Sequence, residues 1–354
     1  MKKLLLILII IASLVLAGWG LWSHSVAQRT SVPPKVTWGW EYRAGDYIRS
    51  KPLVAGGTIY FGCDDNGLYA LDAASGQWRW RFETQDNIDG TPVRVDNLLI
   101  FGSWDGVLYA VDSKTGRGIW RATLDGWLTA GPTSAQGLIY VGAYDGYLYA
   151  VEAATGTVPW RFPTGGAIAS QAQVVDGLLY FASADGFAYT LDTRKGVMRW
   201  RTPTHGPLVA GPLVEGGVVY IASTDRHLYA LDAATGKSRW ARELDAPLEA
   251  TPALAEGRVF VGTLAGTVVA LDAAQGHVQW TFATRGPIWA TPAVDRGLLF
   301  VGSTDDHIYA LDAATGHLLW SYRLGSDAGP PAVADNWLYV GSTDRRLYAF
   351  RLER

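Results

Sequence analysis

The sequence predicts an all-β fold, an eight-bladed β-propeller with four antiparallel strands per blade, closed into a ring by its N-terminal strand. Three observations lead to this prediction. Tryptophan recurs every forty residues, glycine or alanine recurs in a second fixed register, and the last repeat lacks one strand that the residues before the first repeat can supply. The tryptophans that carry the period are Trp40, Trp80, Trp120, Trp160, Trp200, Trp240, Trp280 and Trp320.

Each repeat contains four short strands. Residues 210–240 show apolar or alternating runs separated by turn residues at Gly216-Gly217, Thr224–Arg226 and Ala234–Gly236. Four strands in about 40 to 45 residues is the spacing of propeller blades. We expect the innermost strand to contain stretches of small residues, such as Ala250–Pro252, that crowd around a central channel. Gln171 and Gln173 are polar exceptions that could face this channel.

The two ends of the repeat region predict how the ring closes. The final repeat stops after Leu347–Phe350 without a tryptophan strand of its own, and residues 36–42 contain Trp40 in register. Pairing these segments removes two exposed sheet edges that would otherwise invite aggregation. The propeller is therefore expected over residues 36–354, sealed by residues 36–42.

The N-terminus resembles a membrane-targeting segment. Lys2 and Lys3 precede an uncharged apolar stretch, Leu4–Trp22, which is long enough as a helix to span a hydrocarbon core of about 30 Å. Ser25-Val26-Ala27 also has the small-x-small pattern of a signal peptidase site. Residues 1–27 are thus a signal peptide or an uncleaved membrane anchor, and residues 28–35 are a linker. Either way, the propeller is expected outside the cytoplasm, in the periplasm or at the cell surface.

Composition excludes several classes of function. The net charge is -3 and no block of Lys or Arg stands out, which excludes the usual nucleic-acid binder. The single cysteine, Cys63, allows neither an internal disulfide nor a thiolate metal cluster. It is interpreted as a small residue ending a strand, with a reactive thiol as the alternative. Asp64–Gly67 is interpreted as a hairpin turn rather than a calcium loop, because the ligand alternation and the distal glutamate are absent.

A family resemblance rests on the residues around each tryptophan. Residues 230–240 read A-L-D-A-A-T-G-K-S-R-W, and the positions of Asp232, Thr235, Gly236 and Trp240 recur in residues 110–120 and 310–320. This pattern resembles the tryptophan-docking motif of PQQ-type repeats. The resemblance implies that each indole lies between adjacent blades, stacks on a neighbouring Thr-Gly peptide and donates its N–H to a main-chain carbonyl. These tryptophans are then structural.

The same resemblance raises the question of quinone-dependent catalysis. Quinoprotein dehydrogenases of this type carry long insertions, calcium ligands, a catalytic aspartate and often a vicinal cysteine pair. Here every interval between the repeat tryptophans is forty residues, and no Cys-Cys pair exists. We therefore predict a protein that is not an enzyme and that uses no cofactor and no metal. The alternatives are a PQQ-dependent dehydrogenase and a small-ligand-sensing propeller.

In architecture the sequence is similar to the eight-bladed subunit of the outer-membrane β-barrel assembly machinery. Repeat type, blade count, size and exported location agree. This resemblance implies a monomeric scaffold for protein partners in the cell envelope, held near the membrane by its N-terminal segment.

Topology predicts where such a partner would dock. In a four-stranded meander, the second and fourth connections lie on one face, and this face carries most aromatic residues outside the repeat register. Exposed aromatic and arginine side chains are typical anchors of interfaces. The alternative is that these rings only pack over the blade edges. The candidate partner-binding residues are Trp104, Trp127, Tyr144, Arg285, Trp289, Asp305 and Arg345.

Overall fold

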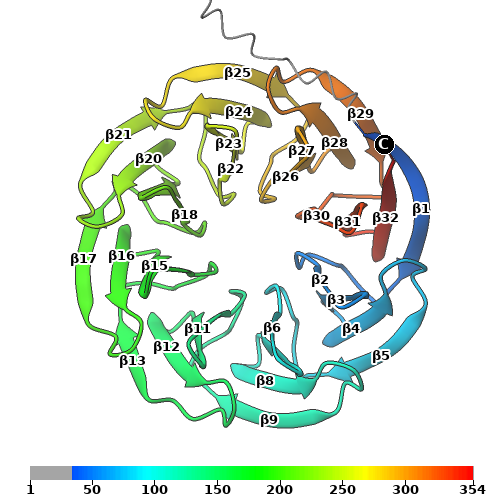
Figure 1. Ribbon diagram of the computed structural model, residues 1–354, viewed down its shortest axis with the longest axis vertical. Helices are drawn as coiled ribbons and strands as arrows, with labels where there is room; N and C mark the ends of the chain where they lie inside the picture. The colour runs from blue at the N-terminus through cyan, green and yellow to red at the C-terminus, as the bar shows by residue number, and fades with distance from the viewer. Residues whose placement is uncertain (1–33, 354) are drawn as a thin grey trace, which may run out of the picture. The chain divides into compact units, whose positions relative to one another are not determined.

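The structure, a computed structural model, describes residues 34–353, which form a closed ring of eight four-stranded sheets (Figure 1). All sheets are antiparallel, as predicted. The expected signal peptide or anchor lies outside the described residues. No helix in the described part of the chain is long and apolar enough to span a membrane.

The strands form four concentric sets around the channel axis. The innermost strands are β2 (Leu53–Ala55), β6 (Val93–Val95), β10 (Thr133–Ala135), β14 (Gln173–Val175), β18 (Leu213–Glu215), β22 (Ala253–Ala255), β26 (Ala293–Asp295) and β30 (Ala332–Ala334). The second set is β3 (Thr58–Cys63), β7 (Leu98–Gly102), β11 (Leu138–Gly142), β15 (Leu178–Ala182), β19 (Val218–Ala222), β23 (Arg258–Gly262), β27 (Leu298–Gly302) and β31 (Trp337–Gly341).

The third and fourth strands of each blade are longer than the innermost strand. The third set is β4 (Gly67–Asp72), β8 (Val107–Asp112), β12 (Tyr147–Glu152), β16 (Phe187–Asp192), β20 (His227–Asp232), β24 (Thr267–Asp272), β28 (His307–Asp312) and β32 (Arg346–Glu353). The outermost set is β5 (Trp78–Glu83), β9 (Gly118–Thr123), β13 (Trp160–Pro163), β17 (Met198–Pro203), β21 (Ser238–Glu243), β25 (Val278–Ala283), β29 (Leu318–Arg323) and β1 (Lys35–Arg43). Blades 1 to 7 are contiguous, from β2–β5 to β26–β29.

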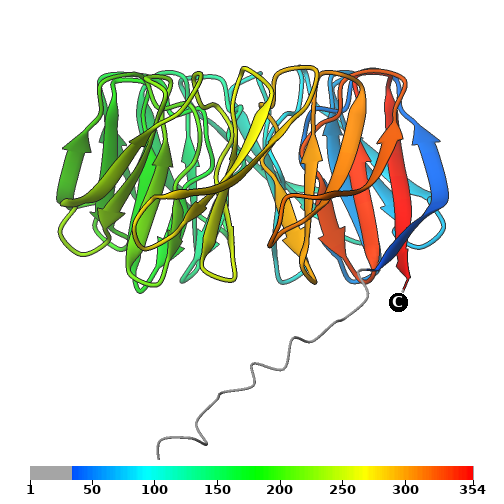
Figure 2. The same cartoon turned by 90° about the horizontal axis from the view of Figure 1, so that it is seen from above.

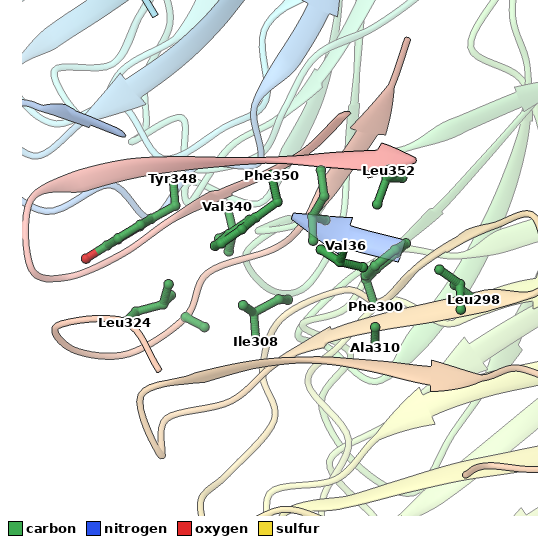
Figure 3. Packing of buried hydrophobic residues seen from close by; sticks show 12 residues of the cluster. Val36, Leu298, Phe300, Ile308, Ala310, Leu324, Val340, Tyr348, Phe350 and Leu352 are labelled. Carbon is green, nitrogen blue, oxygen red and sulfur yellow. The ribbon is translucent and has the colours of Figure 1, made fainter. Parts of the chain in front are cut away.

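Blade 8 is built from both ends of the repeat region, which confirms the predicted closure. Its strand order is β1-β32-β31-β30, and β1 pairs antiparallel with β32 from Lys35 opposite Glu353 to Arg43 opposite Arg346. Val36 of β1 packs into an apolar cluster with Phe300 of blade 7 and Phe350 of β32 (Figure 3). The closing strand therefore holds blade 8 together and also fills its seam with blade 7.

The innermost strands are shorter than expected. The sequence pattern predicts Ala250–Pro252 inside such a strand, but β22 begins only at Ala253. Pro252 has no N–H to donate to a ladder, so regular pairing starts after it. The residues before each of these strands instead form the connection from the preceding blade.

The repeat tryptophans lie at the seams between blades. Trp200 of blade 4 donates its Nε1–H to the Ala233 carbonyl of blade 5 over 3.0 Å, and its ring covers Gly236. A Cβ added to Gly236 would lie 2.6 Å from the Trp200 Cδ2 atom, so only glycine fits under the indole. The equivalent glycine lies under the indoles of Trp40, Trp80, Trp120, Trp160, Trp240 and Trp280.

The seam carbonyls often accept two hydrogen bonds, a feature that the repeat motif does not predict. Tyr180 shares the Ala233 carbonyl with Trp200, and Tyr220 shares the Ala273 carbonyl with Trp240. A tyrosine in the middle of the second strand therefore reinforces the tryptophan of the same blade. The Nε1–H of Trp80 is buried and has no hydrogen-bond partner among the described residues.

Trp320 departs from the expected arrangement. It precedes blade 8, whose third and fourth strands come from opposite ends of the repeat region, so no Thr-Gly turn joins them. Its ring packs against Tyr322 and Phe350, with centroid separations of 6.2 and 5.1 Å. Aromatic packing thus replaces peptide stacking at the closing seam.

Candidate functional site

The second connection of each blade and the connection that leads into the blade form one face of the ring, here called the connection face. Backbone hydrogen bonds join the two kinds of connection: Tyr144 N–H donates to the Trp127 carbonyl, and Thr304 N–H donates to the Pro287 carbonyl. Seen edge-on, the connections gather at the two faces of the propeller (Figure 2). The candidate partner-binding residues lie on the connection face.

Three of these residues meet in an aromatic strip, which we define as Trp104, Trp127 and Tyr144. Trp104 and Trp127 stack with centroids 5.6 Å apart and planes at 14°, and the Tyr144 ring centroid lies 5.8 Å from that of Trp127, with the planes at 45°. Trp127 is 54% exposed and Tyr144 is 47% exposed. The strip extends across blades 2 and 3 and offers aromatic rings to a partner.

A pair of acidic side chains lies at one end of the strip. Trp104 donates its Nε1–H to Asp89 Oδ2 over 3.1 Å, and Asp89 adjoins Asp64 of the β3–β4 turn. Burial, followed by the charge of Asp89, raises the pKa of Asp64 to about 6, and burial also raises the pKa of Asp89. Arg49 Nη1 lies 3.3 Å from Asp64 Oδ2.

The raised pKa values mean that Asp64 and Asp89 keep a proton to a higher pH than two isolated aspartates would. The Oδ1 atom of each carboxyl is buried without a hydrogen-bond partner among the described residues. Two adjoining, partly buried carboxyl groups titrate together, because the first charge opposes the second. The turn itself is a β-hairpin, as predicted: Asp65 Oδ1 accepts the Gly67 N–H, and β3 pairs with β4.

The remaining predicted residues do not join the strip. Arg285 donates its backbone N–H to Asp305 Oδ2 over 2.8 Å, and the same oxygen accepts the hydroxyl of Tyr309. Asp305 thus holds its own turn together. Trp289 is half-buried in the connection before β26, and Figure 1 shows β26 across the ring from β6 and β11 of blades 2 and 3. Arg345 Nε lies 3.9 Å from Asp46 Oδ1.

The innermost strands surround a central channel that contains a cavity of about 920 Å³. Both glutamines singled out in the sequence line this cavity. Gln171 donates to the Pro132 carbonyl over 2.9 Å, while Gln173 hydrogen-bonds both the N–H and the carbonyl of Val214. Within residues 34–353, no three His, Cys, Asp or Glu side chains gather closely enough to hold a metal ion.

Much of this site could not be found from sequence. The Asp64–Asp89 and Trp104–Trp127 pairs join residues on neighbouring blades at separations that are not multiples of the repeat. The only available signal was that aromatic residues outside the register cluster in the connections of blades 2 and 3.

Comparison with known families gives one match that spans the propeller. The profile of a family described as outer membrane protein assembly factor BamB matches residues 35–104, 104–210, 199–290 and 265–353. No curated protein matches the chain by sequence.

Solved structures share the fold at low identity. BamB from Moraxella catarrhalis is 18% identical, with a TM-score of 0.80 over 90% of this chain and 100% of that one. The computationally designed protein Ika8 is 17% identical, with a TM-score of 0.80 over 90% of this chain and 100% of its own. Quinohemoprotein alcohol dehydrogenase ADHIIG from Pseudomonas putida HK5 is 16% identical, with a TM-score of 0.77 over 90% of this chain and 76% of that enzyme. These likenesses establish the ring architecture.

Proposed function

Because the chain belongs to the family of outer membrane protein assembly factor BamB, we propose that it is a non-catalytic scaffold that binds a protein partner during outer-membrane protein assembly. Its proposed location is extracytoplasmic, since Lys2, Lys3 and the apolar stretch Leu4–Trp22 have the features of an export signal or anchor. The domains proposed are this targeting segment in residues 1–27, a linker in residues 28–35 and a monomeric propeller in residues 36–354.

The aromatic strip is the observation that carries the proposal. Trp127 and Tyr144 expose about half of their surfaces on the connection face although each has an aromatic neighbour. Rigid aromatic side chains bury a large area at low entropic cost, which makes them frequent hot spots of interfaces. The other candidates, Arg285, Trp289 and Arg345, are proposed as peripheral contacts of the same face.

The test compares the double variant Trp127→Ala/Tyr144→Ala with Trp78→Ala. Trp78 is the matched control, because it is 60% exposed but lies on the outer strand β5. Each chain is expressed in full length in the source organism, cross-linked and purified, and the co-purified subunits of the β-barrel assembly machinery are quantified.

We expect the double variant to lose about 30-fold or more in partner affinity, the effect of removing a hot spot worth about 2 kcal/mol. The Trp78→Ala protein should bind normally. Equal recovery of the assembly subunits with both variants would place the interface elsewhere, and no recovery with the unaltered protein would contradict the assembly role.

Quinone-dependent oxidation is the second candidate, favoured by the likeness to ADHIIG. Calorimetric titration of the purified chain with PQQ and calcium separates the two functions. We expect a flat titration, because the scaffold needs no cofactor. Saturable heat together with turnover of an alcohol would replace the scaffold with an oxidoreductase.

A further inference from the structure

Seven residues at equivalent positions in blades 1 to 7 form a ring around the central channel. These residues immediately precede the proline or the small residue before each innermost strand, one per blade in blades 1 to 7, and all of them line the cavity. Neighbouring members are in close contact: a Cβ added to Gly131 would lie 2.8 Å from the Thr91 carbonyl oxygen, and one added to Gly211 would lie 2.7 Å from that of Gln171. We call this set of residues the waist ring; its members are Lys51, Thr91, Gly131, Gln171, Gly211, Thr251 and Thr291.

The side chains of the waist ring are rich in hydrogen-bond donors. Thr251 Oγ1 accepts the Gly211 N–H over 3.0 Å, which leaves its own hydroxyl hydrogen to donate. Gln171 uses one of its two amide hydrogens on the Pro132 carbonyl and keeps the other. The hydroxyls of Thr91 and Thr291 form no hydrogen bond with another described residue. No carboxylate occurs in the ring.

Lys51 supplies the only formal charge of the waist ring. Within residues 34–353 its ammonium group forms no ion pair, and burial alone lowers its pKa, without an opposing contribution from any carboxylate. The acidic residues that line the same cavity, Asp89 and Glu249, precede the waist by two positions, toward the connection face. Asp89 is engaged by the indole of Trp104. The lysine is therefore a partly dehydrated cation without a counter-ion.

We infer that the waist ring binds a small oxyanion, a phosphate or a carboxylate, with Lys51 as its charge partner and hydroxyl or amide groups of the ring as additional donors. A buried charge is costly unless it is paired, so an anion in the channel relieves a penalty that the empty protein carries. An ammonium group offers three donors, and an oxyanion offers several acceptor oxygens to an arc of donors. This site is separate from the aromatic strip and does not depend on the proposed scaffold function.

The test uses inorganic phosphate and citrate as probes of the full-length chain, with sodium chloride at equal ionic strength as the blank. Calorimetry gives the affinity, and thermal unfolding reports stability with and without each anion. Lys51→Met keeps the aliphatic stem and removes the charge. Lys237→Met is the matched control, because Lys237 is exposed in the turn that precedes β21.

For the unaltered protein and Lys237→Met, we expect saturable binding and a rise in melting temperature with at least one probe. Lys51→Met should be more stable than the unaltered protein in anion-free buffer and should bind about tenfold or more weakly, as expected when a charged hydrogen bond is lost. Thr91→Val should weaken binding several-fold while its stability in anion-free buffer stays unchanged. A response to citrate alone assigns a carboxylate, and a response to phosphate alone assigns a phosphate.

Two results would overturn the inference. One is a titration in which neither anion differs from chloride. The other is binding that survives in Lys51→Met or that is lost equally in Lys237→Met. Either outcome would show that the charge of Lys51 does not specifically bind the anion.

Discussion

The seam between blades 4 and 5 allows a quantitative test of how the ring is held together. Trp200 is 9% exposed, its Nε1–H is bonded to the Ala233 carbonyl, and its ring lies against Gly236. Trp200→Ala removes the indole ring from this seam and leaves a cavity between the two sheets. Truncation of a buried tryptophan costs about 3 to 5 kcal/mol.

The expected change in melting temperature follows from the size of the propeller. An unfolding entropy of about 2.1 cal/mol/K per residue over about 320 residues gives about 0.7 kcal/mol/K, so a loss of about 4 kcal/mol lowers the melting temperature by about 6 °C. Trp78→Ala is the control, because this tryptophan is 60% exposed on the outer strand β5 and is not one of the repeat tryptophans that fill the seams. It should shift the melting temperature by less than about 2 °C.

A double-mutant cycle tests the geometry directly. Gly236→Ala places a methyl group 2.6 Å from the Trp200 ring, at a backbone φ of +71°. Left-handed backbone costs an alanine about 1 to 2 kcal/mol, and the clash adds to this cost. In the Trp200→Ala background the clash with the indole disappears, while the 2.8 Å contact with Thr202 Oγ1 remains in both backgrounds. Gly236→Ala should therefore cost about 1 to 3 kcal/mol less there than in the unaltered protein. Equilibrium urea denaturation measures all four proteins, and additive effects would refute the stacking explanation.

Two further predictions concern the acidic pair and the closing strand. The pKa of Asp64 is raised to about 6 by burial and then by Asp89, so the folded state binds this proton more tightly than the unfolded chain, and stability falls as the pH rises from about 4 through 6. Asp64→Asn, which stays neutral, should gain stability relative to the unaltered protein between pH 4 and pH 8 in urea titrations; a constant difference would contradict the shifted pKa. A chain that starts after Arg43 lacks β1 and exposes the edge of β32. Light scattering should therefore detect oligomers of this chain, whereas a chain that starts at Pro34 should not form them. A monomeric truncated chain would show that β1 is not needed to protect this edge.

The repeat made most of the fold predictable. One tryptophan and one turn glycine per forty residues fix the length of a blade, because each indole must reach the turn of the next blade. The register of Trp40 placed β1 correctly in blade 8. The short innermost strands were not predicted, because the effect of residues such as Pro252 on pairing is local and does not alter the period.

The candidate site was predictable only in outline. The sequence pointed to aromatic residues on one face, but the stacking of Trp104 on Trp127 depends on how two blades meet. The Asp64–Asp89 pair was missed for the same reason, since each residue alone resembles an ordinary turn aspartate. Trp320 could not be distinguished from the other repeat tryptophans until the strands of blade 8 were known to come from opposite ends of the repeat region.

The construction of blade 8 also determines when folding can finish. Within the propeller, β1 precedes every other strand along the chain and β32 follows them, yet the two must pair along their lengths, with Lys35 opposite Glu353. Contacts between residues so far apart in sequence form slowly, because a long loop must close before any pairing energy is gained. During synthesis, β1 therefore has no partner strand until β32 has been made. Until these two strands pair, both edges of the incomplete ring remain available to other chains.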